Sequence, residues 1–362
     1  MKAVYIHIPF CKTICSYCDF CKLYYNEEWV DDYLEALNKE IKLNYKNELI
    51  ETIYIGGGTP SCLNMKQLKR LMDIIAVFKL NTNIEFTFEC NIDVTKEQIL
   101  LLKRYGVNRI SIGVQTINEE QLVFLNRKHS KEMVKDKVLE IKQYIDNINL
   151  DLMYALESET LSILKEDLSF YLSLDVKHIS TYSLMICPHT MVYINGVKPI
   201  DEDLDCDMYE LIDKTLINYN HYEISNYAYK GYESKHNLTY WNNEHYYGFG
   251  LGASGYIGNR RYTNTKAYKD YLNGHFISEE IVLSFNETVE NAFILGLRKT
   301  EGIKISDFNN KYQFDLLKTD VINILLKEGK LEILDGNIRI KKKYLYISNT
   351  ILMTFMGVDY EM

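Results

Sequence analysis

Three cysteines lie close together near the start of the chain, in the run Cys11-Lys-Thr-Ile-Cys15-Ser-Tyr-Cys18. Three thiolates this close can bind one metal centre if the segment wraps around it, and thiolate ligands favour zinc or an iron–sulfur cluster. Structural zinc usually takes four protein ligands from two Cys pairs. No second pair occurs elsewhere in the sequence, although Cys21 or His7 offers a fourth ligand. The spacing therefore favours a cluster held by three cysteines, with one iron open to another ligand, over zinc.

The remaining cysteines are too scattered to add to this site. The chain has eight in all, and Cys62, Cys90, Cys187 and Cys206 stand singly, as small buried hydrophobic residues often do. At this chain length eight cysteines do not form a disulfide scaffold, and clustered ones indicate a reducing compartment. The N-terminus lacks the long apolar run and cleavage site of a signal peptide, so we expect a cytoplasmic protein.

Further polar residues follow other apolar runs. The turn Gly56-Gly57-Gly58-Thr59-Pro60 allows the backbone to approach a ligand closely, but such turns are also common between a strand and a helix. Glu89, Gln115 and Asp151 stand at or near the ends of three more apolar runs. One such residue alone is better explained as a helix cap, whereas three in the same relative place favour a ligand site at one edge of a sheet.

A second candidate site is the segment His236-Asn237-Leu-Thr-Tyr240-Trp241. Histidine is a common axial ligand of haem iron, and Tyr and Trp offer flat apolar surface to a porphyrin. A single histidine in a loop is more often a hydrogen-bonded surface residue, so the segment alone leaves both interpretations open.

Alternating strand and helix patterns predict the elements that carry these residues. Short apolar runs predict strands over 3–8, 52–55, 84–89, 109–114, 149–153 and 178–184. Helical periodicity predicts helices over 27–45, 65–78, 95–105, 119–125, 131–145 and 162–174. Strand–helix alternation with short links implies an α/β fold of six units with parallel strands. An open sheet and a barrel both place ligand-binding groups at the C-terminal ends of the strands.

The pattern changes in the second half of the chain. We expect a helix over 207–216, followed over 220–265 by an ordered loop region rich in Tyr, Asn and Gly. Helices over 287–297 and 314–327 and a hairpin over 331–340, turning at Asp335-Gly336, follow. The predicted division is a barrel domain over 1–220, with its cluster loop at 11–21, a connecting region over 221–284 and a small α+β module over 285–362.

Composition limits the kinds of partner. The chain has 41 Lys plus Arg against 50 Asp plus Glu, a net charge of −9, which argues against broad binding to nucleic acid or anionic lipid. No run approaches the ~18 consecutive apolar residues that cross a bilayer. We therefore expect no nucleic-acid partner and no integral membrane segment.

The cysteine run resembles the motif of the radical S-adenosylmethionine (SAM) superfamily, a C-x3-C-x2-C loop after the first strand of a partial (β/α)6 barrel. The resemblance implies a [4Fe-4S] cluster on Cys11, Cys15 and Cys18, whose open iron binds SAM and whose electron cleaves it to a deoxyadenosyl radical. It also implies an electron donor such as flavodoxin or ferredoxin. The residues that it assigns to SAM are Tyr5, Tyr17, Gly57, Gly58, Thr59, Glu89, Gln115, Arg127 and Asp151. The planar fork of Arg127 suits the SAM carboxylate.

Within this superfamily, Tyr-Ile-His-Ile-Pro-Phe-Cys11 and Tyr-Cys18-Asp-Phe20 resemble the oxygen-independent coproporphyrinogen III oxidase group. The intact His236 motif resembles the haem-chaperone (HemW-type) branch of that group. This branch implies haem on His236, Asn237, Tyr240 and Trp241, and delivery of haem to an acceptor haem protein.

The alternative is the oxidase activity itself, the oxidative decarboxylation of porphyrinogen propionates in haem synthesis. The oxidases carry a fourth Cys where Phe20 stands here and a longer segment before the cluster loop, and both differences favour the chaperone branch. Whether the protein is an enzyme stays open, and it would be coproporphyrinogen III dehydrogenase-like if catalytic. Cys21 is then a spare thiol.

The chain departs from the family in two loops. Ala155-Leu-Glu-Ser-Glu159 stands where the family has a loop with two glycines and a proline, and Cys187-Pro188-His189 stands where it has Glu-Pro-Gly. We expect these changes to alter the shape of the SAM pocket and to leave the three cluster cysteines unaffected.

Overall fold

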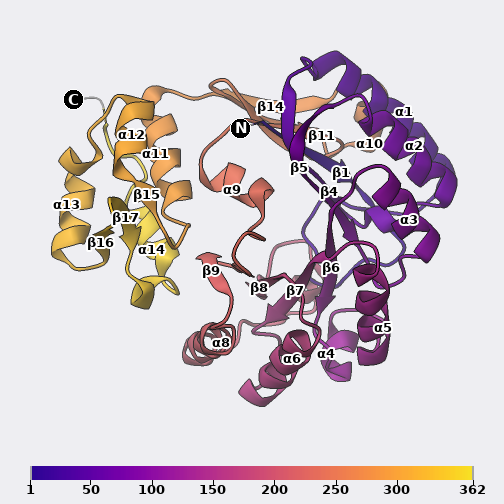
Figure 1. Ribbon diagram of the computed structural model, residues 1–362, viewed down its shortest axis with the longest axis horizontal. Helices are drawn as coiled ribbons and strands as arrows, with labels where there is room; N and C mark the ends of the chain where they lie inside the picture. Colours follow the sequence, from indigo (N-terminus) through magenta and orange to yellow (C-terminus); the bar gives the residue numbers. More distant parts are fainter. Residues whose placement is uncertain (1, 361–362) are drawn as a thin grey trace.

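A large sheet forms the centre of the computed structural model, which describes residues 2–360. Its order is β14-β13-β12-β11-β1-β4-β5-β6-β7-β8-β10-β9. Six neighbouring strands at its centre run parallel: β1 (Ala3–Ile8), β4 (Leu49–Gly57), β5 (Lys79–Cys90), β6 (Arg109–Gln115), β7 (Asn147–Tyr154) and β8 (His178–Ser183). The prediction of six parallel units is therefore confirmed. The sheet curves into a partial barrel (Figure 1).

Helices link these strands and cover the outer face of the sheet (Figure 1). They are α1 (Glu27–Asn44), α2 (Met65–Ile75), α3 (Lys96–Arg104), α4 (Glu119–Phe124), α5 (Lys131–Lys142) and α6 (Leu161–Ser173). Each begins after a residue whose side chain accepts a hydrogen bond from a first-turn amide, namely Asn26, Asn64, Thr95, Asn118, Ser130 and Thr160. Polar caps and apolar periodicity together explain why these helices were predicted to within a few residues.

The two faces of the sheet differ in chemistry because successive strand side chains point to opposite sides. Alternate residues such as Ile55, Phe88 and Ile112 are fully buried in the main hydrophobic core. The residues between them, such as Tyr54, Glu89 and Ser111, line the barrel interior instead. The strand sequences therefore alternate between apolar residues, which form the surrounding core, and polar residues, which line the barrel interior.

The region 220–265 is not the loop region that we expected, because its strands extend the sheet at both edges. These elements are β9 (Asn220–Glu223), β10 (Asn226–Ala228), α9 (Lys235–Trp241), β11 (Tyr246–Phe249), β12 (Ser254–Ile257) and β13 (Arg260–Asn264), followed by α10 (Tyr268–Leu272) and β14 (Ile277–Val282). β10 pairs with β8, and β11 pairs in parallel with β1. Strands of only three to six residues leave little periodic signal, and the pairings of β10 with β8 and of β11 with β1 join segments far apart in sequence. The expectation of an ordered loop region was therefore wrong.

A small parallel pair closes the base of the cysteine loop. β2 (Phe10–Cys11) pairs with β3 (Leu23–Tyr24), so that both ends of the intervening segment are held together. The imidazole of His7 also contacts the carbonyl of Cys21, with 2.7 Å between Nε2 and O. The cysteines thus lie on a loop with two fixed ends.

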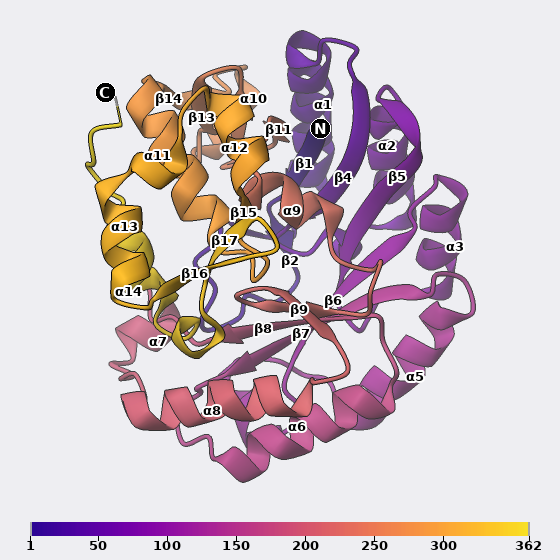
Figure 2. The ribbon, with the colours of Figure 1, turned by 60° about the vertical axis from the view of Figure 1, so that its left-hand side comes forward.

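Residues from 285 onward form a module with its own hydrophobic core, built around Phe293, Phe308 and Phe355. It contains α11 (Phe285–Gly296), β15 (Ile303–Lys304), α12 (Ile305–Tyr312), α13 (Asp320–Lys327), β16 (Leu331–Leu334), β17 (Asn337–Ile340) and α14 (Ser348–Met353). The predicted hairpin is confirmed, with positive φ at both turn residues, Asp335 and Gly336. The module lies beside α9 and contacts α8 (Glu202–Thr215) through Tyr346 and Tyr209 (Figure 2).

The helix predicted over 314–327 is wrong in its first half. The chain forms a short 3-10 turn, η2 (Leu316–Lys318), before α13 begins. The Asp315 side chain caps this turn, and Thr319 has extended backbone (φ −71°, ψ 125°), which interrupts any continuous helix. The remaining short elements are η1 (Pro60–Cys62), α7 (Met191–Ile194) and η3 (Lys342–Tyr344).

The division into 1–220, 221–284 and 285–362 stays a prediction, since one sheet runs through the first two parts. Among residues 2–360, no helix combines the length and the apolar character that crossing a membrane would require.

Candidate functional site

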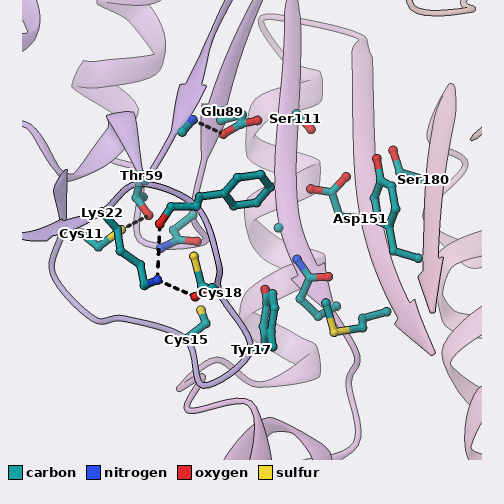
Figure 3. Close-up of a pocket in the computed structure, with 18 of the residues that line it drawn as sticks. Cys11, Cys15, Tyr17, Cys18, Lys22, Thr59, Glu89, Ser111, Asp151 and Ser180 are labelled. Carbon is teal, nitrogen blue, oxygen red and sulfur yellow. Dashed lines mark hydrogen bonds between the residues drawn. The ribbon is translucent and has the colours of Figure 1, made fainter. Parts of the chain in front are cut away.

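The C-terminal ends of the parallel strands and the cysteine loop enclose a cavity of about 490 Å³ (Figure 3). The predicted site residues that line it are Cys11, Cys15, Tyr17, Cys18, Gly57, Gly58, Thr59, Glu89, Gln115, Arg127, Asp151 and Asn237. Tyr5, His236, Tyr240 and Trp241 do not line it. The fold therefore brings residues from several strands, from the loops that follow them and from α9 together at one place.

The three cysteines project toward this cavity from the loop (Figure 3). Cys11 is buried, whereas Cys15 and Cys18 are partly exposed. Thr59 donates a hydrogen bond to the Cys11 sulfur at 3.6 Å, and Arg127 donates one to the Cys15 sulfur at 3.1 Å. Within residues 2–360, no three His, Cys, Asp or Glu side chains are close enough to hold a single metal ion.

Burial keeps two of the loop thiols protonated in the absence of a metal. Burial raises the pKa of Cys11 to about 11, and the nearby Cys18 and Cys15 thiols add to this effect. Burial also raises the pKa of Cys18. Both groups are therefore protonated at neutral pH, and a bound metal would displace their protons. Hydrogen bonds to sulfur from Thr59 and Arg127 fit thiolates that ligate iron.

Neighbouring atoms leave no room for a side chain at Gly56 or Gly58 of the glycine turn. A Cβ at Gly56 would lie 2.6 Å from the carboxyl carbon of Glu89, and one at Gly58 would lie 2.8 Å from the carbonyl oxygen of Phe10. Gly57 has a φ of +116° and donates its amide to Glu89 Oε2 at 3.1 Å. The turn therefore lets the cysteine loop and the Glu89 carboxyl approach one another around the cavity.

Two carboxyl groups face the cavity from β5 and β7, the strands on either side of β6 (Figure 3). Glu89 accepts a hydrogen bond from the Tyr54 hydroxyl at 2.7 Å, and Asp151 accepts one from the Asn149 amide at 2.8 Å. Burial raises the pKa of Glu89 to about 7, and it also raises the pKa of Asp151. Glu89 is thus close to half-protonated at neutral pH, so it can either donate to or accept from the hydroxyl groups of a ligand.

Gln115 and Arg127 also line the cavity. Gln115 has a left-handed backbone (φ 75°), and its Oε1 is buried without a hydrogen-bond partner. Arg127 also donates to Asn91 Oδ1 at 3.1 Å. An unsatisfied buried acceptor beside a cationic fork suits an amino acid ligand, whose ammonium donates and whose carboxylate accepts. These residues therefore fit the methionyl end of SAM.

The sequence did not indicate Arg109, which lines the floor of this cavity. Its side chain is buried, and its Nε has no hydrogen-bond partner among the described residues. It belongs to the same strand face as Ser111 and Gly113, which also line the cavity. The alternation Arg-x-Ser-x-Gly along β6 could have indicated a cavity-lining face. The sequence alone does not tell which face of the strand points inward, so this alternation could not be used.

The His236 motif lies on α9 and is more deeply packed than we expected. His236 is buried, its Nδ1 is 2.9 Å from Thr52 Oγ1, and its Nε2 is 2.8 Å from the Tyr240 hydroxyl. Burial lowers its pKa to about 3, which keeps the imidazole neutral. Both ring nitrogens are therefore engaged within the protein, and iron ligation by His236 would require these contacts to break.

The other aromatic candidates line a second cavity of about 360 Å³, next to α9. Tyr5, Tyr240 and Trp241 form part of its wall, together with Tyr246, Tyr256 and Arg261. The Tyr5 hydroxyl is also 3.0 Å from Nδ1 of His7. Tyr5 therefore does not line the main cavity. Asn237, which belongs to the same motif as Tyr240 and Trp241, lines the main cavity instead.

Comparison with known proteins agrees with this architecture. Residues 5–171 match the model of the Radical SAM superfamily. The chain is 40% identical to Heme chaperone HemW of Lactococcus lactis over 374 residues, covering 99% of this chain and 98% of the relative. It is 38% identical to Heme chaperone HemW of Bacillus subtilis over 380 residues, covering 99% and 100%.

A solved structure of coproporphyrinogen III oxidase (HemN) from Escherichia coli superposes with a TM-score of 0.86 at 22% identity, covering 98% of this chain and 90% of that one. At this identity the match establishes the shared fold. Membership of the superfamily implies a [4Fe-4S] cluster and SAM as cofactors. Because the chain is 38% and 40% identical to these two relatives over nearly its full length, it belongs to the HemW family within the radical SAM superfamily.

Proposed function

We propose that this protein is a haem chaperone, which holds a [4Fe-4S] cluster and SAM in the main cavity and passes haem to an acceptor haem protein in the cytoplasm. The observation that carries the proposal is the near full-length similarity to two proteins named Heme chaperone HemW. The cavity supports it, because the residues expected to bind cluster and SAM, with the exception of Tyr5, line one continuous space.

The contacts in the cavity indicate which residues would bind the cluster and which would bind SAM. Cys11, Cys15 and Cys18 would hold the cluster, which supplies an electron for SAM cleavage when both are bound. Arg127 and Gln115 would hold the methionyl carboxylate and ammonium. Glu89 and Asp151, on β5 and β7, would accept hydrogen bonds from the ribose hydroxyls. An external electron donor of the flavodoxin or ferredoxin type would reduce the cluster.

The experiment that tests the proposal combines cofactor loading with haem transfer. The full chain is reconstituted anaerobically with iron and sulfide, and SAM and haem binding are measured by calorimetry and absorption. Haem-loaded protein is then mixed with an apo haem protein, and transfer is followed by the spectrum of the acceptor. Transfer that depends on the loaded chain supports the chaperone.

Two controls separate the competing functions. Replacing Cys11, Cys15 and Cys18 together by Ala should abolish iron and sulfide retention. The same preparation is incubated with SAM, a reductant and coproporphyrinogen III. Decarboxylation of the propionates without haem transfer would establish the oxidase alternative, and release of deoxyadenosine in either assay would establish enzymatic SAM cleavage.

A further inference from the structure

In the described part of the chain, the second cavity, of about 360 Å³, shares no lining residue with the main cavity. Its wall comes from the barrel and from the C-terminal module, because Tyr240 and Trp241 of α9 line it together with Leu295 of α11. The family resemblance assigns Tyr240 and Trp241 to haem. A haem held by the motif on α9 would therefore also border this cavity, and the other groups that line it can contribute to its recognition.

Aromatic rings form much of the wall of the second cavity. Tyr240 and Tyr246 pack edge to face, with 4.6 Å between their ring centroids, and Tyr5 and Tyr256 add two further rings. Aromatic walls suit a flat apolar molecule such as a porphyrin. The faces of such rings can also bind a cation, so the charges at the cavity decide which kind of ligand it takes.

Arg261, on β13, places a positive charge at this cavity. Its guanidinium lies over the Tyr256 ring, with 4.6 Å between Cζ and the ring centroid, and its Nη2 donates to Asn243 Oδ1 at 3.1 Å. Its Nε is buried and has no hydrogen-bond partner among the described residues, and the same is true of Nε1 of Trp241. Buried N–H groups are rarely left without an acceptor. Two such donors at one cavity therefore indicate a ligand that supplies acceptor oxygens.

The C-terminal module adds further positive charge beside the cavity. Lys311 donates to the carbonyl oxygens of Asn242 and Asn243, at 3.1 and 3.2 Å, where α9 ends. Burial lowers the pKa of Lys299 and of Lys311, and the negative charge of Glu244 opposes this effect. Glu244 lines the cavity, but its carboxylate thus interacts with two ammonium groups of the module. The surrounding charges therefore favour an anionic ligand over a cationic one.

We propose that Arg261 binds a propionate of the haem in the second cavity and so selects porphyrins that carry free carboxylates. An Arg fork can pair with a carboxylate through two parallel hydrogen bonds, and Nε is one of its donors. A porphyrin without free carboxylates would leave this partly buried cation unpaired, which lowers affinity. The inference rests on the proposed function, and it adds to the motif on α9 a specificity residue from a strand of the barrel.

The test compares two iron porphyrins that differ at the propionates, ferric haem and its dimethyl ester. Each is titrated into the cluster-loaded full chain, and affinities are obtained from absorption spectra. We expect wild type to bind haem at least about tenfold more tightly than the ester, as the loss of a hydrogen bond to a charged group implies. Arg261→Gln should bind both with similar affinity. Arg261→Lys, which keeps the charge and loses the fork, should keep part of the preference.

The preceding residue provides a matched control. Arg260 also lies on β13, but its side chain is 56% exposed and pairs with Glu280 of β14. Successive strand residues point to opposite faces of a sheet, and Arg260 does not line the cavity. Arg260→Gln should therefore keep the wild-type preference for haem. Because the preference is a ratio of two affinities within one variant, a general loss of stability cancels from it.

The outcomes separate this inference from the function beneath it. An unchanged preference in Arg261→Gln, an equal loss of preference in Arg260→Gln, or no preference in wild type would each overturn the role of Arg261 while the proposed chaperone function stands. Failure of the wild-type chain to bind either porphyrin would overturn the proposed function as well. Iron and sulfide content and circular dichroism establish that each variant is folded and loaded with its cluster.

Discussion

The Arg127 guanidinium and the Cys15 sulfur are in direct contact, with 3.1 Å between Nη1 and Sγ across 112 residues of sequence. The residue expected to bind the SAM carboxylate therefore touches an expected cluster ligand. The same side chain reaches Asn91 and the Gly113 carbonyl, which hold its planar fork in place. One cation therefore contacts residues that we expect at both the cluster site and the SAM site.

Replacing Arg127 by Lys should weaken SAM binding and leave the cluster in place. Lysine keeps the charge but cannot contact Cys15, Asn91 and a carboxylate together. Hydrogen bonds to charged groups contribute ~1.5–3 kcal/mol, so SAM affinity should fall about 10- to 100-fold. Anaerobic calorimetry measures it, with Lys128→Ala, at the exposed neighbouring residue, as control. Unchanged affinity would show that Arg127 serves the loop alone.

Replacing Gly58 by Ala should impair cluster loading. The added Cβ would lie 2.8 Å from the Phe10 carbonyl and 3.0 Å from the Cys11 sulfur, so the cysteine loop must shift outward. We expect reduced iron and sulfide content after reconstitution while the secondary structure is retained. Gly106→Ala is the control, because that Cβ meets no atom within 4 Å although its φ of +90° is strained. Equal cluster loss in both variants would point to general destabilisation instead.

The sequence predicted the elements that have strong local signals. Glu89 and Asp151 were identified because each stands on a predicted strand of the barrel, and parallel strands bring such residues to one side of a sheet. Arg109 was missed because a lone Arg at the start of a strand is ordinarily exposed, and only the register of β6 against its neighbours turns it inward.

Other parts of the structure could not be predicted from the sequence because they depend on contacts between residues far apart in the chain. The contact between His236 and Thr52 spans 184 residues and depends on α9 lying against β4, which no local pattern encodes. The same holds for β11, which pairs with β1 from far along the chain. The sequence could therefore name the motif on α9 but could not tell whether its imidazole faces a ligand or the protein interior.

Stability should depend on pH through Glu40, a buried residue of α1 away from the cavity. Its carboxyl accepts hydrogen bonds from the Gly250 amide at 2.8 Å and from the side chains of Asn264 and Tyr271, each at 2.5 Å. Burial raises its pKa from 4.5 to about 7. Because the folded pKa exceeds the unfolded one, the stabilisation is present below pH 4.5 and is lost as the pH rises to about 7.

The loss is on the order of 3 kcal/mol, since each pKa unit corresponds to about 1.4 kcal/mol. Urea unfolding of wild type and Glu40→Gln should therefore show a difference in stability that changes across this window. The neutral amide cannot titrate, so the variant lacks this part of the pH dependence whatever its absolute stability. Parallel pH profiles for the two proteins would contradict the assignment.

Replacing His236 by Ala should destabilise the fold before it affects any ligand. The substitution removes a buried ring and leaves Thr52 and Tyr240 without their partner, a loss of about 2–4 kcal/mol. The urea midpoint of the cluster-free protein measures it, and Tyr240→Phe, which removes only one of the two contacts, should show a smaller loss. If haem binding disappears in His236→Ala while the urea midpoint is unchanged, the imidazole serves haem directly. A lower midpoint with unchanged haem spectra would instead assign His236 to holding α9 on β4.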